Sequence, residues 1–512
     1  MGEAHPTNCR RMEGFCGRVD MHKINIKFLW FVLIFSGLST AGARGQEEGI
    51  SLAVWPTAEA QLALKYQLLP RFSDQRPGNA ANVYKEALAK MPEDYKEDLN
   101  EEINRLQRIH INNLEIKEVE AALEPYKPAI AQVKLAACCE ECEWGLSLRH
   151  PNSINILSEF NGYWYLSKVI ALQAKGQIAE KKFDEAVETL QMGFALAKHI
   201  SQIRTFEMDV LVNGISQNML DQVENFIQTS ESHNLFWALS GLTKPFIDKS
   251  LSMRQSREYI FITHPQLHDR ERKVLSQEQA EEALGYLASK RLNGFEDEDY
   301  DISRTIKLLY PAAREFLKEK GYSPEKIEAM SSSQVILIHQ LADFDQMMDE
   351  LYRWFYFPYG QAQQGWKTLM KEWGVKDNLE YSFFFYPKYD PEKFENISTY
   401  IAKLSVVALN AEYRKSTYLD QKIAALQCIE AMRMYAADHE GKLPKSLRDI
   451  QDVPIPLNPF TGEDFIYKWE DDKVILVLAN DFEYPHEKLF YEITIKEKIN
   501  AWGKAPPYEL LK

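Results

Sequence analysis

The sequence predicts a mainly α-helical protein that carries a small α+β module at its C-terminal end. Two stretches with helical spacing of apolar residues, 163–200 and 404–437, support the helical part. After Gly441 the pattern changes to short apolar runs separated by proline, glycine and acidic turns, which is typical of strands and loops. At 512 residues the chain is long enough for roughly two to four domains or for one long repeat array.

The N-terminal stretch Met21–Ala43 has the three parts of a secretory signal peptide. Lys23 and Lys27 form its basic part, residues 28–35 are an unbroken apolar run, and it ends in a small-residue Ala-Gly-Ala pattern. The apolar run is too short to cross a bilayer comfortably. We therefore expect residues 1–43 to be a signal peptide with an extension before Met21, and the mature chain to be exported to the periplasm or the extracellular space.

The expected mature chain is acidic. The whole chain has 60 Lys and Arg against 75 Asp and Glu, a formal net charge of −15. Residues 1–43 hold five Lys or Arg and three Asp or Glu, so their removal lowers the charge by two, to −17. Nucleic acid and anionic membrane surfaces are disfavoured as partners because they also carry negative charge. No later apolar stretch reaches the length of a membrane span, so we expect a soluble mature protein.

Proline, glycine and polar clusters mark the ends of the expected helices. Residues 44–60 read as a short polar lead-in, and Ser323-Pro324 is a helix-start signal with a capping serine. The acidic run 296–299 is typical of a solvated loop. The helices expected in the body, in chain order, are 80–90, 101–110, 129–144, a pair within 163–200, 203–228 and 334–355.

The stretch 163–200 predicts two amphipathic helices joined by the polar link 179–182. The apolar stripes consist of Leu166, Ile170, Ala174 and Ile178 in the first helix and Phe183, Ala186, Val187, Leu190, Phe194 and Ala197 in the second. Ala186 and Gly193 are small enough to let a neighbouring helix approach closely. An aromatic residue three positions before a small alanine resembles a tetratricopeptide-type hairpin. One such hairpin cannot bury its stripe alone, so flanking helices are expected.

Residues 334–355 form the second strongly periodic stretch, which predicts one long amphipathic helix. Its apolar stripe consists of Leu337, Leu341, Phe344, Met348, Leu351 and Phe355. An aromatic belt follows at 352–389 and includes Trp354, Trp366 and Trp373. Aromatic side chains dominate cores as well as interfaces, so the belt either fills a core or stacks on a sugar or a hydrophobic partner.

The C-terminal part combines a long helix with short strands. Residues 404–437 predict the helix, and the runs 465–469 and 473–478 predict a hairpin around Asp471-Asp472. Residues 489–496 predict a third strand. We therefore expect a helical, repeat-like (α-solenoid-like) body at 44–403 and a long helix with a strand module at 404–512.

Residues 424–477 resemble the soluble C-terminal part of type II secretion pseudopilins. The shared features are a helix, a turn reading GKLPKSL, a loop reading PLNPFTGEDFIY and terminal strands. The chain differs from a pilin because it begins with a cleavable-type signal and lacks an apolar N-terminal filament helix. The resemblance therefore implies a borrowed or convergent module.

The mature chain as a whole resembles a group of exported bacterial proteins of uncharacterised function that combine the same parts. The resemblance is carried by Cys142-Glu143-Trp144-Gly145, the hairpin at 163–200, Tyr310-Pro311-Ala312-Ala313, Glu328-Ala329-Met330 with Gln334, and the C-terminal module. It supports the architecture and implies no activity.

Three cysteines, Cys138, Cys139 and Cys142, fall on the helix expected at 129–144, and Cys428 lies far away in sequence. In an oxidising compartment Cys139 and Cys142 could form a redox pair. Redox motifs of this spacing usually follow a strand and open a helix, whereas this pair lies near a helix end. Zinc requires four ligands, and no second pair is visible. We therefore expect buried, unreactive thiols.

Polar residues at helical spacing suggest one further metal-site candidate. His339, Asp343, Gln346 and Glu350 fall on one face of 334–355, as ligands in helical bundles do. That face lies opposite the apolar stripe, so we expect it to be solvated.

Two loop candidates have equally simple explanations. His264 and His268 flank Pro265, which disfavours a regular helix aligning the two rings, so we expect a surface loop. A second set offers oxygen atoms to calcium but matches no EF-hand spacing, and turn chemistry explains it. Its members are Asp452, Asn458, Thr461, Glu463 and Asp464.

The sequence contains no nucleophile elbow, phosphate-binding loop or zinc-protease motif, so no catalytic, cofactor-binding or metal-binding residue is assigned. Stacked helical hairpins form concave surfaces suited to protein or peptide ligands. We expect an exported binding or scaffolding protein that acts through protein–protein interaction in the cell envelope without a cofactor. The alternatives are an envelope hydrolase with carboxylates from separate helices and a carbohydrate-binding protein that uses the belt at 352–389.

Overall fold

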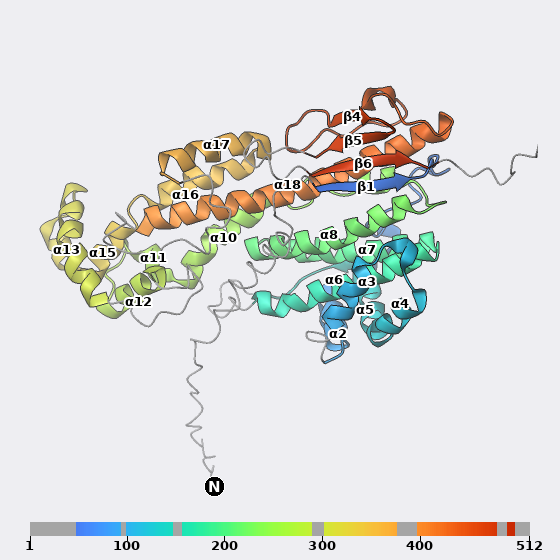
Figure 1. Cartoon of the computed structure of the whole chain (residues 1–512). Helices are drawn as coiled ribbons and strands as arrows, with labels where there is room; N and C mark the ends of the chain where they lie inside the picture. The colour runs from blue at the N-terminus through green and yellow to red at the C-terminus, as the bar shows by residue number, and fades with distance from the viewer. Residues whose placement is uncertain are drawn as a thin grey trace, which may run out of the picture.

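The computed structural model describes residues 48–93, 99–146, 156–288, 302–375, 397–478 and 489–496. Its elements are mainly helices, and a small sheet is formed largely by C-terminal strands (Figure 1). The expected mainly α class with a small C-terminal sheet is confirmed, whereas a tetratricopeptide-like arrangement stays a prediction. The expected signal peptide, residues 1–43, lies outside the described residues.

The helices and strands have the following bounds. The helices are α2 (Ala80–Ala89), α3 (Leu99–Arg108), α4 (Ile116–Leu123), α5 (Lys127–Ala137), α6 (Ile156–Ala179), α7 (Phe183–Ile200), α8 (Phe206–Gln228), α9 (Phe236–Ser240), α10 (Lys249–Thr263), α11 (Pro265–Asp269), α12 (Gln277–Ala288), α13 (Ile302–Glu319), α14 (Pro324–Glu328), α15 (Ser332–Gln340), α16 (Phe344–Tyr352), α17 (Tyr359–Glu372) and α18 (Ile397–Asp438). The strands are β1 (Glu48–Val54), β2 (Arg76–Asn79), β3 (Cys139–Glu141), β4 (Ile466–Glu470), β5 (Lys473–Val477) and β6 (Leu489–Ile495).

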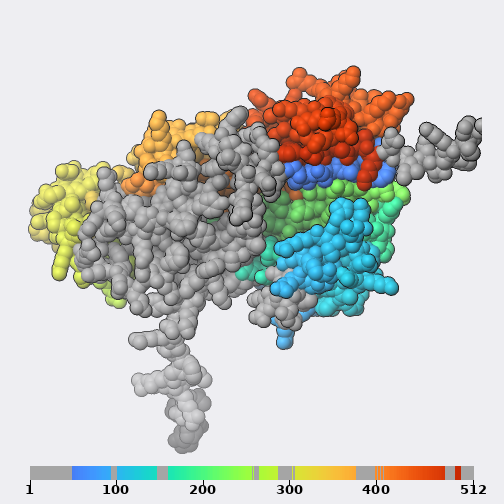
Figure 2. Space-filling view, in the orientation of Figure 1, coloured from blue at the N-terminus to red at the C-terminus, as the bar shows by residue number. Residues whose placement is uncertain are grey.

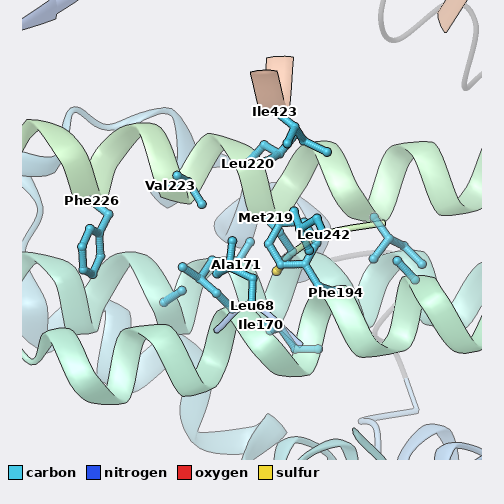
Figure 3. Packing of buried hydrophobic residues seen from close by; sticks show 14 of the residues in the cluster. Leu68, Ile170, Ala171, Phe194, Met219, Leu220, Val223, Phe226, Leu242 and Ile423 are labelled. Atoms are coloured by element: carbon cyan, nitrogen blue, oxygen red, sulfur yellow. The ribbon is translucent and has the colours of Figure 1, made fainter. Parts of the chain in front are cut away.

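The central hairpin forms as the sequence predicts and packs with α8. Helix α6 ends at Ala179 and α7 begins at Phe183, on either side of the expected polar link. Every residue of the two expected stripes is buried, and Phe183 is the most exposed of them at 7%. Gly193 permits the close approach of α7 and α8, because a Cβ there would lie 2.0 Å from Met219 Sδ. Figure 3 shows Met219 near Phe194 in this packed interior.

Buried apolar side chains form two hydrophobic cores. The first contains the stripes of α6, α7 and α8, residues 419–434 of α18 and the inner face of the four-stranded sheet. The second is built mainly from α12, α13 and α15 to α17, and it includes Ala402 and Val406 of α18. The 42-residue helix α18 therefore joins the two cores, and it runs along the molecule in Figure 1. The domain boundary expected at residue 404 falls inside this helix.

The four-stranded sheet has the order β1-β6-β5-β4. Strands β4 and β5 form the expected hairpin, in which the turn residue Asp471 has a φ of 54°. Strand β6 matches the third expected strand and pairs antiparallel with β5. The hairpin and β6 are therefore confirmed.

Strand β1 corrects the expectation of a polar lead-in at 44–60. It pairs in parallel with β6, from Glu48 beside Leu489 to Val54 beside Ile495. Leu52 and Val54 belong to the first hydrophobic core, which gives this segment an apolar surface to fold onto. In Figure 2 β1 (blue) lies between the C-terminal sheet (red) and the helix α8 (green).

The helix expected at 129–144 is shorter in the structure. Helix α5 ends at Ala137, and the next residues form β3. Strand β2 supplies the competing partner: Arg76 N donates to Cys138 O at 2.7 Å, and Arg76 lies opposite Cys139 in the parallel pair. The three neighbouring cysteines therefore lie beyond the end of the helix.

The single helix expected at 334–355 is also wrong. It is interrupted between α15 and α16, where Asp343 has left-handed backbone geometry with a φ of 61°. Its apolar stripe is nevertheless buried throughout, because both shorter helices pack against the second core. Burial of the stripe, rather than helix continuity, is what the periodicity predicted correctly.

Two local signals near proline have different outcomes. The loop expected around His264 and His268 contains the short helix α11, which Pro265 begins. Proline fits this first position because its fixed φ suits a helix and its missing N–H is not needed there. The expected helix start at Ser323-Pro324 is confirmed, since Ser323 Oγ accepts a hydrogen bond from Lys326 N at 3.3 Å. The acidic run 296–299 lies outside the described residues.

Candidate functional site

A polar pocket lies where five distant segments of the chain meet, and we call it the Trp55 pocket. Its volume is about 430 Å³, within the range of about 300–1,000 Å³ that small-ligand sites occupy. The lining residues are Trp55, Ile111, Asn112, Leu114, Ile116, Ala179, Lys181, Gln228, Thr229, Ser230 and Lys496.

The five segments give the pocket two chemically different sets of residues. The connection between α3 and α4 and the end of α6 supply an apolar wall of Ile111, Leu114, Ile116 and Ala179, with the amide of Asn112 beside it. The ends of β1, β6 and α8 and the turn after α6 supply an aromatic ring, two ammonium groups, one amide and two hydroxyls. The pocket is therefore suited to a ligand that is apolar on one side and polar on the other.

A fully buried ion pair on α18 holds two of these segments in place. Arg433 and Glu430 are both 0% exposed, and Arg433 Nη1 lies 2.8 Å from Glu430 Oε2. Arg433 Nε donates to Trp55 O at 2.9 Å, and Nη2 donates to Thr57 Oγ1 at 2.7 Å. The same Nη2 donates to Ser232 Oγ at 2.8 Å, four residues beyond the end of α8. One guanidinium therefore fixes both the Trp55 wall and the chain that follows α8.

The two lysines of the pocket differ in their electrostatic surroundings. Lys181 Nζ pairs with Glu231 Oε1 at 2.8 Å. Lys496 Nζ lies 5.3 Å from the centroid of the Trp55 ring, a cation–π distance. No carboxylate of the described residues forms an ion pair with Lys496. With respect to the described residues, Lys496 is therefore an ammonium group that a ligand anion can approach without displacing a carboxylate.

The expectation of buried thiols is confirmed for three of the four described cysteines. Cys138, Cys139, Cys142 and Cys428 are free thiols, and all but Cys138 are buried. Burial raises the pKa of Cys142 to about 12. Burial likewise raises the pKa of Cys139 above its ordinary value. A thiol whose pKa is raised is a poor nucleophile, because the thiolate is the reactive form.

The candidate metal face around His339 is not assembled. His339 lies in α15 and packs its ring 5.0 Å from that of Phe316, so it is half-buried rather than solvated. Burial lowers the pKa of His339. Asp343 is exposed in the break after α15, and Gln346 donates to Glu350 at 3.1 Å on α16. The solvated face is thus confirmed for Asp343 and Gln346 and wrong for His339.

The two loop candidates are explained by local hydrogen bonds. His268 Nε2 lies 2.6 Å from Arg272 Nη1, one turn further along the chain. Asn458 Oδ1 accepts from Phe460 N at 2.9 Å and from Gln421 Nε2 at 3.0 Å. These bonds confirm turn chemistry at Asn458. In the described part of the chain no cluster of His, Cys, Asp or Glu is arranged to hold a metal ion.

The described part of the aromatic belt mostly fills the second core. Trp366 is 0% exposed, and its ring lies 5.1 Å from that of Phe355 and 5.4 Å from that of Tyr413. Tyr356 and Phe357 are exposed. Residues 376–389 of the belt lie outside the described residues. A core role therefore accounts for the central members, and the described residues of the belt form no continuous surface on which a sugar could stack.

A buried polar cluster at the start of α8 and α10 was not anticipated from the sequence. Lys249 Nζ lies 3.2 Å from Asp209 Oδ2, and Ser252 Oγ donates to Asp209 Oδ1 at 2.9 Å. Burial raises the pKa of Asp209 to about 6. These residue types occur in catalytic sites, but the three residues are 1–3% exposed. The cluster therefore joins two helices rather than facing a ligand.

Comparison with protein-family models, with curated proteins and with solved structures finds no match to this chain. The pocket is therefore interpreted from its own geometry. Within the ranges that the structure describes, no helix combines the length and the apolar character needed to cross a membrane.

Sequence reasoning missed the Trp55 pocket because its residues come from five places in the chain. The segment before Trp55 was taken as a polar lead-in, although Ile50, Leu52 and Val54 alternate with other residues at the spacing of a half-buried strand. A second signal was the charged pair Glu430 and Arg433 within the apolar run of α18. A charge at a buried helical position indicates a specific partner.

Proposed function

We propose that this chain is an exported binding protein that holds a protein or peptide partner of the cell envelope at the Trp55 pocket. The observation that carries the proposal is the pocket itself, which is open, has an apolar and a polar wall, and is built from five segments. Export rests on the tripartite sequence of Met21–Ala43. Outside the pocket, the described cluster of Asp209, Lys249 and Ser252 is buried and joins two helices.

The rigidity of the pocket supports a binding role. The Arg433–Glu430 pair anchors the backbone at the lining residue Trp55 and at Ser232, two residues beyond the lining residue Ser230. Groups that are already held in place lose little conformational freedom when a ligand binds, which favours affinity. A scaffolding protein needs this property because it must present the same surface to each partner.

The test is site-specific photo-crosslinking in the envelope fraction of the source cells. A benzoylphenylalanine photo-crosslinker is placed at Ser230 in the pocket, and at the exposed β4 residue Lys468 as the matched control. We expect one discrete adduct from position 230 and none from position 468. No adduct from position 230, or the same adduct from both positions, would refute binding at the pocket.

Export is tested separately by the N-terminus of the isolated protein. We expect mass spectrometry of the periplasmic or secreted protein to find a chain that starts near Arg44. An intact chain that starts at Met1 or Met21 in the cytoplasm would contradict export, whatever the result of the crosslinking.

A further inference from the structure

We infer that the Trp55 pocket recognises a free carboxylate next to an apolar side chain, as at the C-terminal residue of a peptide. This inference rests on the proposed binding function and names the ligand chemistry of the same pocket. It is argued from the charge, the hydrogen-bond donors and the apolar wall of the lining residues.

The charge of the pocket favours an anion. Lys181 is neutralised by Glu231 at 2.8 Å, whereas Lys496 faces the Trp55 ring. The indole face stabilises the ammonium but leaves its N–H groups to bond with an oxygen anion. A single ammonium suits a singly charged carboxylate. Phosphate recognition more often uses the two-pronged donor arrangement of arginine, and no arginine lines this pocket.

Carbonyls at two of the helix ends around the opening already accept backbone hydrogen bonds. The carbonyls at the end of α6 are already bonded, since Lys181 N donates to Ile178 O at 2.9 Å and Lys182 N donates to Gln177 O at 2.8 Å. At the end of α8, Thr229 N donates to Phe226 O at 3.1 Å. Because these acceptors are occupied, the helix ends have less capacity to bind a cation.

The donors come from the polar wall and from α4. Asn112 and Ser230 carry side chains that donate hydrogen bonds. The eight-residue helix α4 begins at the lining residue Ile116. Glu118 N and Val119 N already donate to Glu115 O, so the N–H groups of Ile116 and Lys117 are the ones that can face a ligand. These groups can bond to the second carboxylate oxygen and to the preceding peptide carbonyl of a bound chain end.

The apolar wall gives the ligand its second feature. Ile111, Leu114, Ile116 and Ala179 face the same cavity as the two lysines. A C-terminal residue with a branched aliphatic or aromatic side chain can place its carboxylate at Lys496 and its side chain on this wall. Burial of that side chain adds binding free energy in proportion to the apolar surface removed from water.

Isothermal titration calorimetry at low salt tests the inference with short probes. The probes are acetyl-Ala-Ala-X peptides in which X is Leu, Ile, Val or Phe, each as the free acid and as the C-terminal amide. We expect at least one acid to bind and its amide to bind at least about tenfold more weakly, because a charge-assisted hydrogen bond is lost. Affinity should also fall as salt is added.

Variants of the lysine locate the interaction. Lys496→Gln should weaken binding of the peptide acid at least about tenfold and leave binding of the peptide amide unchanged. Lys496→Arg should keep most of the affinity for the acid. Lys468→Gln, which removes an exposed lysine on β4, is the matched control and should change nothing. Equal binding of acid and amide, no binding by any acid, or an unchanged affinity in Lys496→Gln would overturn the inference.

Small acids separate the possible sources of the carboxylate. Acetyl-leucine and hexanoate carry the same charge and an apolar group without a peptide chain. Binding of the tripeptide acid but not of these two supports a peptide end, whereas equal binding of all three overturns it in favour of a free small acid. A crosslink at position 230 together with no preference for acids would leave the binding function standing and refute only this ligand chemistry.

Discussion

Replacement of Arg433 by methionine probes the fully buried ion pair with Glu430. The variant leaves the Glu430 carboxylate at 0% exposure without its cation, and it removes the donors to Trp55 O, Thr57 Oγ1 and Ser232. Removing one partner of a buried ion pair costs about 3–5 kcal/mol. A typical domain is stable by about 5–15 kcal/mol. We therefore expect Arg433→Met to lower the unfolding free energy by a large fraction, as measured by urea titration with circular dichroism.

The pH dependence and a double variant test the reasoning behind this cost. Burial raises the pKa of Glu430, and Arg433 opposes that rise. Without Arg433 the folded state holds a proton that the unfolded chain releases near pH 4, so the stability of Arg433→Met should fall as pH rises above about 4. The double variant Glu430→Leu with Arg433→Met removes both charges and should recover most of the loss. A double variant no more stable than the single one would refute the argument.

Three further perturbations follow from particular contacts. Phe194→Ala should lower the unfolding free energy by about 3–5 kcal/mol. Hydrogen exchange should show that amide protection is lost throughout the first core, including residues 419–434, before it is lost in the second core. Equal loss of protection in both cores would contradict the two-core description. Gly193→Ala should destabilise the folded chain by about 1–3 kcal/mol, because its Cβ would meet Met219 Sδ at 2.0 Å. Gly285→Ala in α12, where nothing lies within 4 Å of the added Cβ, should stabilise it by about 0.5–1 kcal/mol. Thermal melts of both variants measure the two effects. Burial raises the pKa of Asp420 to about 6. The folded chain therefore gains stability as pH falls from about 6 to about 4. Asp420→Asn should flatten that part of the curve of unfolding free energy against pH, as measured by urea titration.

The sequence predicted the parts of the fold that depend on local spacing. The stripes of α6 and α7 repeat over several turns, and their burial followed from periodicity alone. The hairpin turn at Asp471 was also predicted correctly, because turn residues between two apolar runs constrain the chain locally. Where the outcome depended on a distant partner, prediction failed. Strand β3 replaces the last turn of a helix because Arg76 lies beside Cys139, and no spacing within 129–144 contains that information.

The candidate site shows the same limit more strongly. None of its lining residues forms a motif, because Trp55, Asn112, Lys181, Ser230 and Lys496 are brought together only by the packing of separate elements. The cysteines, His339 and Asn458 were singled out from the sequence by their chemical type. In the structure they mostly pack in the interior or form hydrogen bonds in turns.

The parallel pairing of β1 with β6 has a consequence for the order of events during synthesis. Ser51 and Glu492, which share a hydrogen bond across these strands, are 441 positions apart. A ribosome delivers the first strand long before the last one exists, so β1 must wait without its sheet partner while nearly the whole chain is made. Contacts of such sequence separation slow folding, and an unpaired strand edge invites aggregation in the interval. A chain truncated before Leu489 therefore lacks β6 and also leaves β1 without the strand that it pairs with.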